Sequence, residues 1–125
     1  MSGIDFKKIG KTLRLRRRQK GLTLETLASQ VGVSFNYISE LERGDKQKVP
    51  SDEVLIKLAD LLSIDEKEIF EGFGKLPNSI VQELEQNEML LNTLYEIKSN
   101  PNLSDIDRNA LYMEIRKLYL KHLGK

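Results

Sequence analysis

The apolar residues of this chain recur every three or four positions, which is the spacing of one face of an α-helix. In the first part of the chain this pattern predicts five short helices, at about residues 4–20, 24–31, 35–43, 52–62 and 64–71. No stretch shows a sustained alternation of apolar and polar residues, which is the pattern of a half-buried strand. We therefore expect an all-α protein.

Residues that favour helix ends lie between the predicted helices. Thr23, Ser34 and Ser51 each precede an apolar-periodic segment and are therefore expected to be N-caps. Ser63 and Glu66 have the spacing of a capping box, which predicts that the fifth helix begins at residue 64. These signals place the helix boundaries more narrowly than the apolar spacing alone.

Two glycines and a proline follow the fifth predicted helix within residues 72–78, and this composition is typical of a linker. Beyond it, residues 80–98 and 105–123 each predict a helix, separated by a short turn that contains Pro101. The expected architecture is a five-helix domain at residues 1–75, a linker at 76–78 and a two-helix C-terminal hairpin at 79–125.

The net charge of the chain is only +1, but its charges are unevenly distributed. Residues 1–48 have a surplus of six positive charges, whereas residues 49–76 have a surplus of four negative charges. Basic surface in the first third of the chain favours an acidic partner such as nucleic acid. The sequence contains no run of about 18 apolar residues, which is the length that a membrane-spanning helix needs. We therefore expect a soluble cytoplasmic protein with no membrane partner.

The sequence contains little that favours catalysis or cofactor binding. There are no cysteines, which excludes disulfides and thiolate metal sites, and His122 is the only histidine. No glycine-rich phosphate loop is present. We expect no enzyme activity, no metal site and no cofactor.

Residues 21–44 contain a recognisable motif. The segments that carry it are Gly21-Leu22-Thr23-Leu24-Glu25-Thr26-Leu27-Ala28, Val31-Gly32-Val33-Ser34, Tyr37-Ile38-Ser39 and Leu41-Glu42-Arg43-Gly44. They resemble the XRE family of Cro and phage-repressor regulators, and the likeness extends through Pro50-Ser51 to Ile69-Phe70. The resemblance implies a repressor-like DNA-binding domain, in which the helix at 35–43 enters the major groove of double-stranded DNA.

Carried over position by position, the resemblance also implies roles for single residues. Base edges would be read by Ser34, Phe35, Asn36, Tyr37 and Glu40. The DNA backbone would be contacted by Ser39, Lys46 and Lys48, and a structural ion pair would join Arg17 to Glu42. Asn36 has the groups to pair with adenine, and Glu40 can accept from cytosine or remain a solvated charge.

Phe35 leaves two alternatives open, because it can cover a thymine methyl group or pack against its own domain. Two other positions depart from the family pattern. Leu24 replaces a glutamine that is frequent in the family, so a contact that positions a phosphate is missing, and Arg16 replaces an apolar residue.

The predicted hairpin carries more apolar side chains than two helices can bury. Those expected to mediate dimerisation are Leu84, Leu91, Tyr95, Tyr112, Ile115 and Tyr119. An XRE domain followed by a helical hairpin is similar to SinR-type repressors, which implies a homodimer on an inverted-repeat operator and a protein antagonist or toxin as a further partner. Docking of the hairpin onto residues 1–71 is the structural alternative. The functional alternative is a protein-interaction module, an antitoxin or regulatory adaptor, with weak or no DNA binding.

Overall fold

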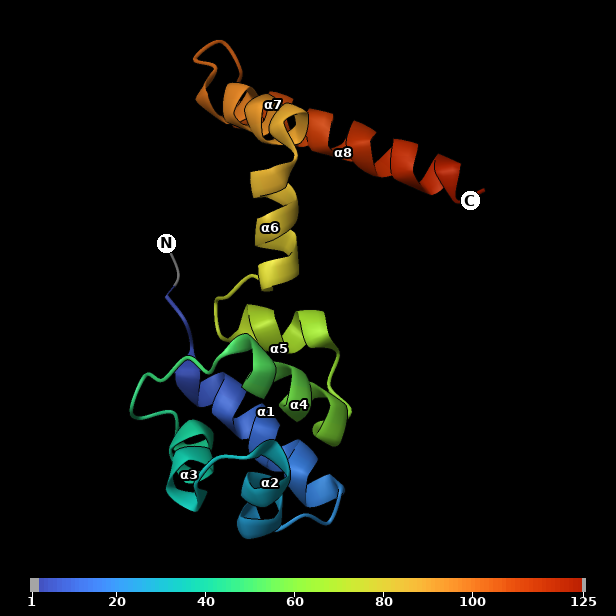
Figure 1. Ribbon diagram of the computed structural model, residues 1–125. Helices are drawn as coiled ribbons and strands as arrows, with labels where there is room; N and C mark the ends of the chain where they lie inside the picture. The colour runs from blue at the N-terminus through green and yellow to red at the C-terminus, as the bar shows by residue number, and fades with distance from the viewer. Residues whose placement is uncertain (1–2, 125) are drawn as a thin grey trace. The chain divides into compact units, whose positions relative to one another are not determined.

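The computed structural model describes residues 3–124, and the regular structure within this range is entirely α-helical (Figure 1). The helices are α1 (Phe6–Gln19), α2 (Leu24–Val31), α3 (Phe35–Arg43), α4 (Asp52–Leu62), α5 (Glu66–Gly72), α6 (Asn78–Gln86), α7 (Glu88–Ser99) and α8 (Asp105–His122). They fall into two compact units that divide between Ile80 and Val81. The prediction of an all-α fold, with five helices followed by C-terminal helices, is confirmed.

A single apolar core holds the first unit together. Helix α1 packs against α3, α4 and α5, while α2 packs against α3 and α4. The buried apolar residues of the described chain are Ile9, Leu13, Leu27, Ala28, Val31, Ile38, Leu41, Leu55, Leu58, Ala59, Leu62, Ile64, Ile69, Phe70 and Phe73. All of them belong to this unit, so its folding is driven by burial of its own apolar surface.

The ends of α2, α3 and α4 follow the predicted local signals. The side chains of Thr23, Ser34 and Ser51 each accept a hydrogen bond from the backbone N–H three residues later, at 3.0, 3.1 and 3.3 Å respectively. Gly32 and Gly44 end α2 and α3 with φ angles of 87° and 67°. Glycine adopts this left-handed conformation at little cost because it has no Cβ.

The predicted start of the fifth helix is wrong. Ser63 is not an N-cap but ends α4 in the left-handed conformation, with φ 53°. Asp65 caps α5 instead, and Ile64 is buried between the two helices. Helix α1 likewise starts at Phe6 rather than at residue 4, because the side chain of Asp5 accepts the N-cap hydrogen bond.

The residues predicted to form a linker, 76–78, belong to the first unit. Lys75 forms an ion pair with Asp52 at 2.6 Å and donates a hydrogen bond to the backbone oxygen of Pro50 at 3.2 Å. The backbone N–H of Asn78 donates to the other carboxylate oxygen of Asp52 at 2.8 Å. These contacts attach the start of α6 to the start of α4. The hydrogen bond from Lys75, followed by that from Asn78, lowers the pKa of Asp52.

The second unit contains a helix break that the sequence analysis did not predict. Residues 80–98 were expected to form a single helix, but α6 ends at Gln86 and α7 begins at Glu88. Asn87 lies at the break, where its side chain caps α7 by accepting from Leu90 N at 3.0 Å. Three helices rather than two therefore follow the first five, with α6 separate from α7 and α8.

The turn between α7 and α8 is fixed by Arg108. Its guanidinium donates to the backbone oxygens of Ile97, at 3.1 Å, and Asn100, at 3.2 Å, and thereby satisfies carbonyl groups at the end of α7. Ser104 caps α8 through a complete capping box with Asp107. Even so, no described residue of α6, α7 or α8 is buried. The apolar side chains of these helices are thus at most partly buried.

Candidate nucleic-acid interface

Helices α2 and α3 form a helix-turn-helix whose turn is defined by hydrogen bonds at the end of α2. The backbone N–H groups of Gly32 and Val33 both donate to the carbonyl oxygen of Ala28, at 2.9 and 3.0 Å. Ser34 then caps α3. The apolar side chains Ile38 and Leu41 anchor α3 in the core, which fixes the direction in which its opposite face points.

Three of the five predicted base-reading residues are exposed at the start of α3. Ser34 and Asn36 are exposed. Phe35 is 45% exposed and is not among the described side chains that pack against the core. Phe35 also lines a surface pocket together with Leu22 and Leu24 of its own domain, so both roles given for Phe35 stay predictions. Ser34 has a structural function as well, because its hydroxyl oxygen accepts the hydrogen bond from Tyr37 N.

Tyr37 and Glu40, also predicted to read bases, are engaged within the domain. The Tyr37 ring packs against the edge of the core, and this burial raises the pKa of its hydroxyl. The ammonium group of Lys48 lies 5.2 Å from the centre of that ring and forms an ion pair with Glu40. A hydrogen bond from Lys48 lowers the pKa of the Glu40 carboxyl group. Glu40 is thus paired with Lys48 in the structure, and its role toward base edges stays a prediction.

The residues predicted to contact the DNA backbone differ in their surroundings. Lys46 is exposed in the loop between α3 and α4. Ser39 accepts a hydrogen bond of 2.5 Å from the guanidinium of Arg43, which also pairs with Asp45 at 3.3 Å. Arg43 was not among the predicted site residues, although its position four residues after Ser39 on one helix face was the available signal.

The ion pair implied for Arg17 and Glu42 is present. The two guanidinium nitrogens Nε and Nη2 of Arg17 donate to the carboxylate oxygens of Glu42 at 2.7 and 3.1 Å, a bidentate arrangement. Only 11% of the Arg17 side chain and 6% of the Glu42 side chain are exposed. Arg17 also donates to the backbone oxygen of Leu22 at 2.9 Å. This pair joins α1 to the end of α3 and to the segment before α2.

Close backbone packing supports the same junction. A Cβ on Gly10 would lie 2.5 Å from the carbonyl oxygens of Leu41 and Glu42, so α1 and the end of α3 approach each other more closely than any other residue would permit. Gly44 is similarly tight, because a Cβ there would lie 2.5 Å from the carbonyl oxygen of Phe6. The orientation of α3 relative to α1 is therefore fixed by packing and by charge.

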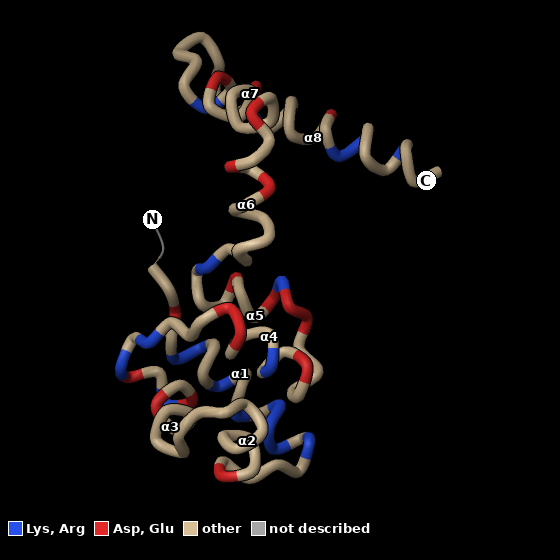
Figure 2. The backbone as a smooth tube through the Cα atoms, in the orientation of Figure 1, with Lys and Arg blue, Asp and Glu red and all other residues tan. Residues whose placement is uncertain are grey.

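The basic residues gather on one part of the first unit. Figure 2 shows Lys and Arg along α1 and in the loop after α3, whereas Asp and Glu gather on α4 and α5. The exposed cationic side chains of α1 are Lys7, Lys8, Lys11, Arg14 and Arg18. Arg16, which departs from the family pattern, donates to the backbone oxygen of Ser63 at 2.9 Å and so has a structural contact.

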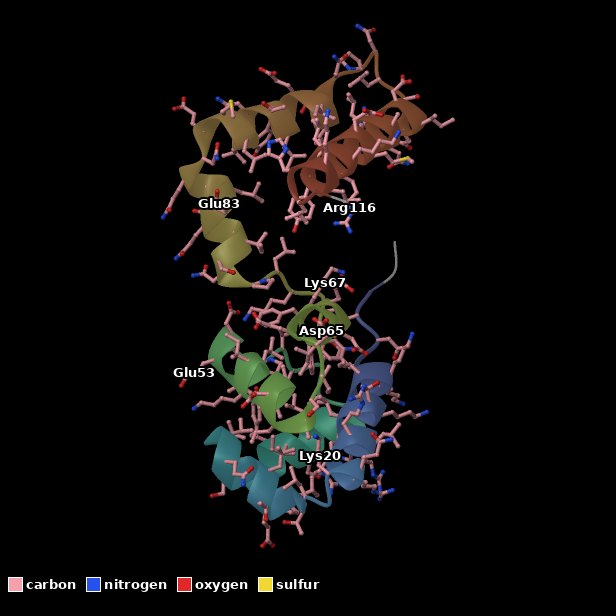
Figure 3. All side chains as sticks on the ribbon, turned by 90° about the vertical axis from the view of Figure 1, so that its right-hand side faces the viewer. Lys20, Glu53, Asp65, Lys67, Glu83 and Arg116 are labelled. Atoms are coloured by element: carbon pink, nitrogen blue, oxygen red, sulfur yellow. The ribbon has the colours of Figure 1, made fainter. Side chains whose placement is uncertain are left out.

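The residues predicted to mediate dimerisation lie in the second unit and at its border. Tyr95 on α7 is 66% exposed, and Ile115 and Tyr119 on α8 are 55% and 54% exposed. Leu84 on α6 and Leu91 on α7 are partly exposed, and Tyr112 is 37% exposed. Arg116, labelled in Figure 3, lies with its guanidinium 5.7 Å from the centre of the Tyr119 ring.

Comparison with known proteins identifies the type of domain. A helix-turn-helix family model matches residues 13–69, which comprise the second half of α1, all of α2 to α4 and the first four residues of α5. The uncharacterised HTH-type transcriptional regulator YazB of Bacillus subtilis is 35% identical over 60 residues, which are 48% of this chain and 84% of YazB. The chain belongs to the XRE family of helix-turn-helix regulators. This agrees with the expectation that it is not an enzyme.

Other known proteins are similar to about half of the chain. The HTH-type transcriptional regulator SlrR of Bacillus subtilis is 38% identical over 64 residues, covering 51% of this chain but only 41% of SlrR. The ImmF control region 10 kDa protein of Bacillus phage phi105 is 32% identical over 62 residues, 50% of this chain and 67% of that protein. A crystal structure of the clp gene regulator ClgR from C. glutamicum has 33% identity, covers 58% of this chain and 92% of that one, and superposes with a TM-score of 0.46.

Residues 3–124 contain neither a membrane-spanning helix nor a cluster of metal-binding side chains. No helix in this range combines the length and the apolar character that crossing a bilayer requires. No group of three or more His, Asp or Glu side chains in this range is arranged to hold a metal ion.

Proposed function

We propose that this XRE protein is a sequence-specific DNA-binding repressor that acts as a dimer on an inverted-repeat operator. The observation that carries the proposal is the first turn of α3, where Phe35 and Asn36 are exposed on a helix whose other face is anchored in the core. A helix held in this way can enter the major groove without rearrangement of its domain. The surplus of positive charge in residues 1–48 supplies attraction for the phosphate backbone.

Within this proposal, residues divide into those that select sequence and those that supply affinity. The amide of Asn36 can make two hydrogen bonds to adenine, and the ring of Phe35 can contact a thymine methyl group. Lys46 is exposed in the loop after α3 and would contact a phosphate. Ser39 would act with Arg43, since their side chains are hydrogen-bonded to each other.

The dimer is proposed because the second unit exposes apolar surface that its own helices leave uncovered. Leu94, Leu111 and Tyr112 are each between 37% and 39% exposed, while Ile115 and Leu118 are more than half exposed. Where exposed apolar side chains form a large contiguous patch, that patch typically marks a protein interface. A second copy would bury it and place two α3 helices at half-sites one DNA turn, about 34 Å, apart.

Site selection from random duplex DNA by the full-length protein tests the reading of sequence. We expect an enriched inverted repeat, with Asn36→Ala relaxing the choice at one position in each half-site. Lys46→Ala is expected to weaken binding to all sequences alike and to lower the salt slope by about one unit. If Asn36→Ala and Lys46→Ala change every sequence by the same factor, Asn36 is not a reader. Repression itself is tested by transcription from a promoter that overlaps the selected site.

Sedimentation of the full-length protein tests the dimer. Ile115→Asp places a charge on the apolar surface of α8, and we expect it to convert the dimer to a monomer and to weaken binding to the inverted repeat. Leu15→Asp is the matched control, because Leu15 on α1 has the same exposure, 57% against 55% for Ile115, but lies in the first unit. A dimer that survives Ile115→Asp, or one that Leu15→Asp disrupts equally, would contradict the assignment of the interface.

The apolar surface of the second unit also suits a different protein partner, and this observation supports a second candidate function. In that case the chain would be an interaction module, an antitoxin or regulatory adaptor, with weak or no DNA binding. Absence of any enriched sequence, together with a monomeric wild-type protein, would favour this function over the repressor.

A further inference from the structure

The pairing of Glu40 with Lys48 occupies two residues on the face expected to approach DNA. The Lys48 ammonium forms an ion pair with Glu40 and lies over the ring of Tyr37, 5.2 Å from its centre. The exposed fractions of the two paired side chains are 20% for Glu40 and 41% for Lys48. Both are therefore held against the domain rather than extended into solvent.

The loop after α3 is shaped so that Lys48 returns to this helix. Gln47, immediately before it, has φ 52°, a left-handed conformation that side-chain-bearing residues adopt rarely. The loop ends at Pro50, which is buried and whose backbone oxygen accepts a hydrogen bond from Lys75. The position of Lys48 is thus set by the loop as well as by its two contacts on α3.

This arrangement has opposite consequences for the two charges when DNA approaches. A lysine that reaches a phosphate releases a counterion and adds to affinity, but Lys48 can do so fully only by leaving Glu40. The released carboxylate would then face the phosphates without compensation, which is unfavourable. Its lowered pKa means that Glu40 is ionised at neutral pH, so the competition operates under ordinary conditions.

We propose that Glu40 acts as an intramolecular competitor of DNA phosphates for Lys48, and that it limits affinity for all sequences instead of reading cytosine. This inference rests on the proposed DNA binding. It assigns Glu40 a positioning role: the residue determines where the Lys48 ammonium lies, and the phosphate contact is made by Lys48. The consequence is a protein whose non-specific binding is weaker than its basic surface would otherwise give.

The test is a comparison of Glu40→Gln with the wild type, both full length, on the selected operator and on a scrambled duplex of equal length. We expect Glu40→Gln to bind both duplexes more tightly, by a similar factor. One additional phosphate contact steepens the salt slope by about 0.9, which corresponds to an additional loss of about 3.5-fold between roughly 50 and 200 mM salt. Glu40→Ala is expected to behave in the same way, without an amide that could retain Lys48.

Two controls separate release of Lys48 from the removal of a negative charge. Glu53→Gln breaks the pair between Glu53 and Lys57 on α4, and Glu53 is 78% exposed and labelled in Figure 3. It removes the same charge but is expected to leave the salt slope unchanged. In a Lys48→Ala background, Glu40→Gln should likewise leave the slope unchanged, because no lysine remains to be released.

Three outcomes would overturn the inference. If Glu40→Gln weakens binding to the operator but not to the scrambled duplex, Glu40 reads bases. If the salt slope of Glu40→Gln equals that of Glu53→Gln, the ion pair does not restrain Lys48. If the wild type and every variant fail to bind either duplex, the proposed DNA binding fails first, and that result is distinct from the other two.

Discussion

The buried ion pair between Arg17 and Glu42 allows a quantitative prediction about stability. Removing one partner of a buried pair leaves the other as an uncompensated charge, which typically costs about 3–5 kcal/mol. Only 11% of the Arg17 side chain and 6% of the Glu42 side chain are exposed, so this cost applies to the pair. Glu42→Met leaves the Arg17 guanidinium without its carboxylate, and Arg17→Met also leaves the Leu22 carbonyl without its donor. We therefore expect each single variant to lose about 3–4 kcal/mol of unfolding free energy.

The double variant distinguishes burial from simple attraction. With both side chains replaced by methionine, no buried charge remains, so the loss is expected to be smaller than the sum of the two single losses by about 2 kcal/mol or more. Urea unfolding, followed through the backbone amide signals of the first unit, gives all four free energies. Total stabilities of small domains are about 5–15 kcal/mol, so losses of this size are readily measured.

An exposed ion pair of the same chain provides the matched comparison. Lys67 and Glu71 on α5 are joined at 2.5 Å, a distance no longer than that of the buried pair, but their side chains are 80% and 64% exposed. Lys67→Met and Glu71→Met are each expected to change stability by less than about 1 kcal/mol. If the variants of Arg17 and Glu42 cost no more than these, burial does not determine the contribution of the pair and the reasoning is wrong.

Three further predictions follow from the packing and the charges. Gly10→Ala should destabilise the first unit by about 1–3 kcal/mol in thermal unfolding, because the added methyl group meets backbone oxygens, whereas Gly3→Ala, with nothing within 4 Å, should have little effect. The pKa of Asp52 is lowered in the folded protein, so the contribution of Asp52 to stability is present above the ordinary aspartate pKa and is lost as pH falls through the lowered value. The amide signal of Asn78 should report this titration in NMR. Lys75→Ala should shift the midpoint of the titration upward. For the proposed dimer, dilution below its dissociation constant should reduce amide protection in α7 and α8 but not in α1–α5.

The central helices could be predicted from sequence because their ends are specified locally. Thr23, Ser34 and Ser51 are capping residues next to the segments they cap, and Gly32 and Gly44 suit the left-handed positions that end α2 and α3. Each signal lies within one helical turn of the boundary it determines. Local chemistry was therefore sufficient, and the bounds of these three helices agree with the prediction.

The boundaries that were missed depend on competition between signals. At Ser63, the predicted capping box does not form. Ser63 ends α4, Ile64 is buried, and α5 begins at the residue after Asp65. At Asn87, a capping residue lies within an uninterrupted apolar spacing, so the period alone predicts a continuous helix. Helical periodicity shows which face is apolar, but it does not show where a polar side chain replaces a backbone hydrogen bond.

The candidate site was predictable as a set of positions but not as a set of contacts. The family resemblance placed Glu40 and Lys48 on the same surface without relating them to each other. Their pairing depends on the conformation of Gln47 and on the path of the loop that follows α3, and neither is encoded in a recognisable motif. The engagement of Ser39 with Arg43 was missed for a simpler reason, since Arg43 was considered only as part of the family motif.

The contacts made by α3 leave few of its side chains available to read bases, and this is a reason why a dimer would be needed. Tyr37 packs on the core, Glu40 pairs with Lys48 and the Ser34 hydroxyl caps the helix, so the side chains most available for base edges are Phe35 and Asn36. Good base contacts discriminate by about 1–3 kcal/mol each, so one half-site would provide about 2–6 kcal/mol. Specific and non-specific binding typically differ by about 4–10 kcal/mol. The discrimination from two half-sites would reach this range, whereas that from one half-site would cover only its lower part. With so few readers on each α3, sequence selection by this protein would depend on the apolar surface of the second unit as much as on the helix-turn-helix.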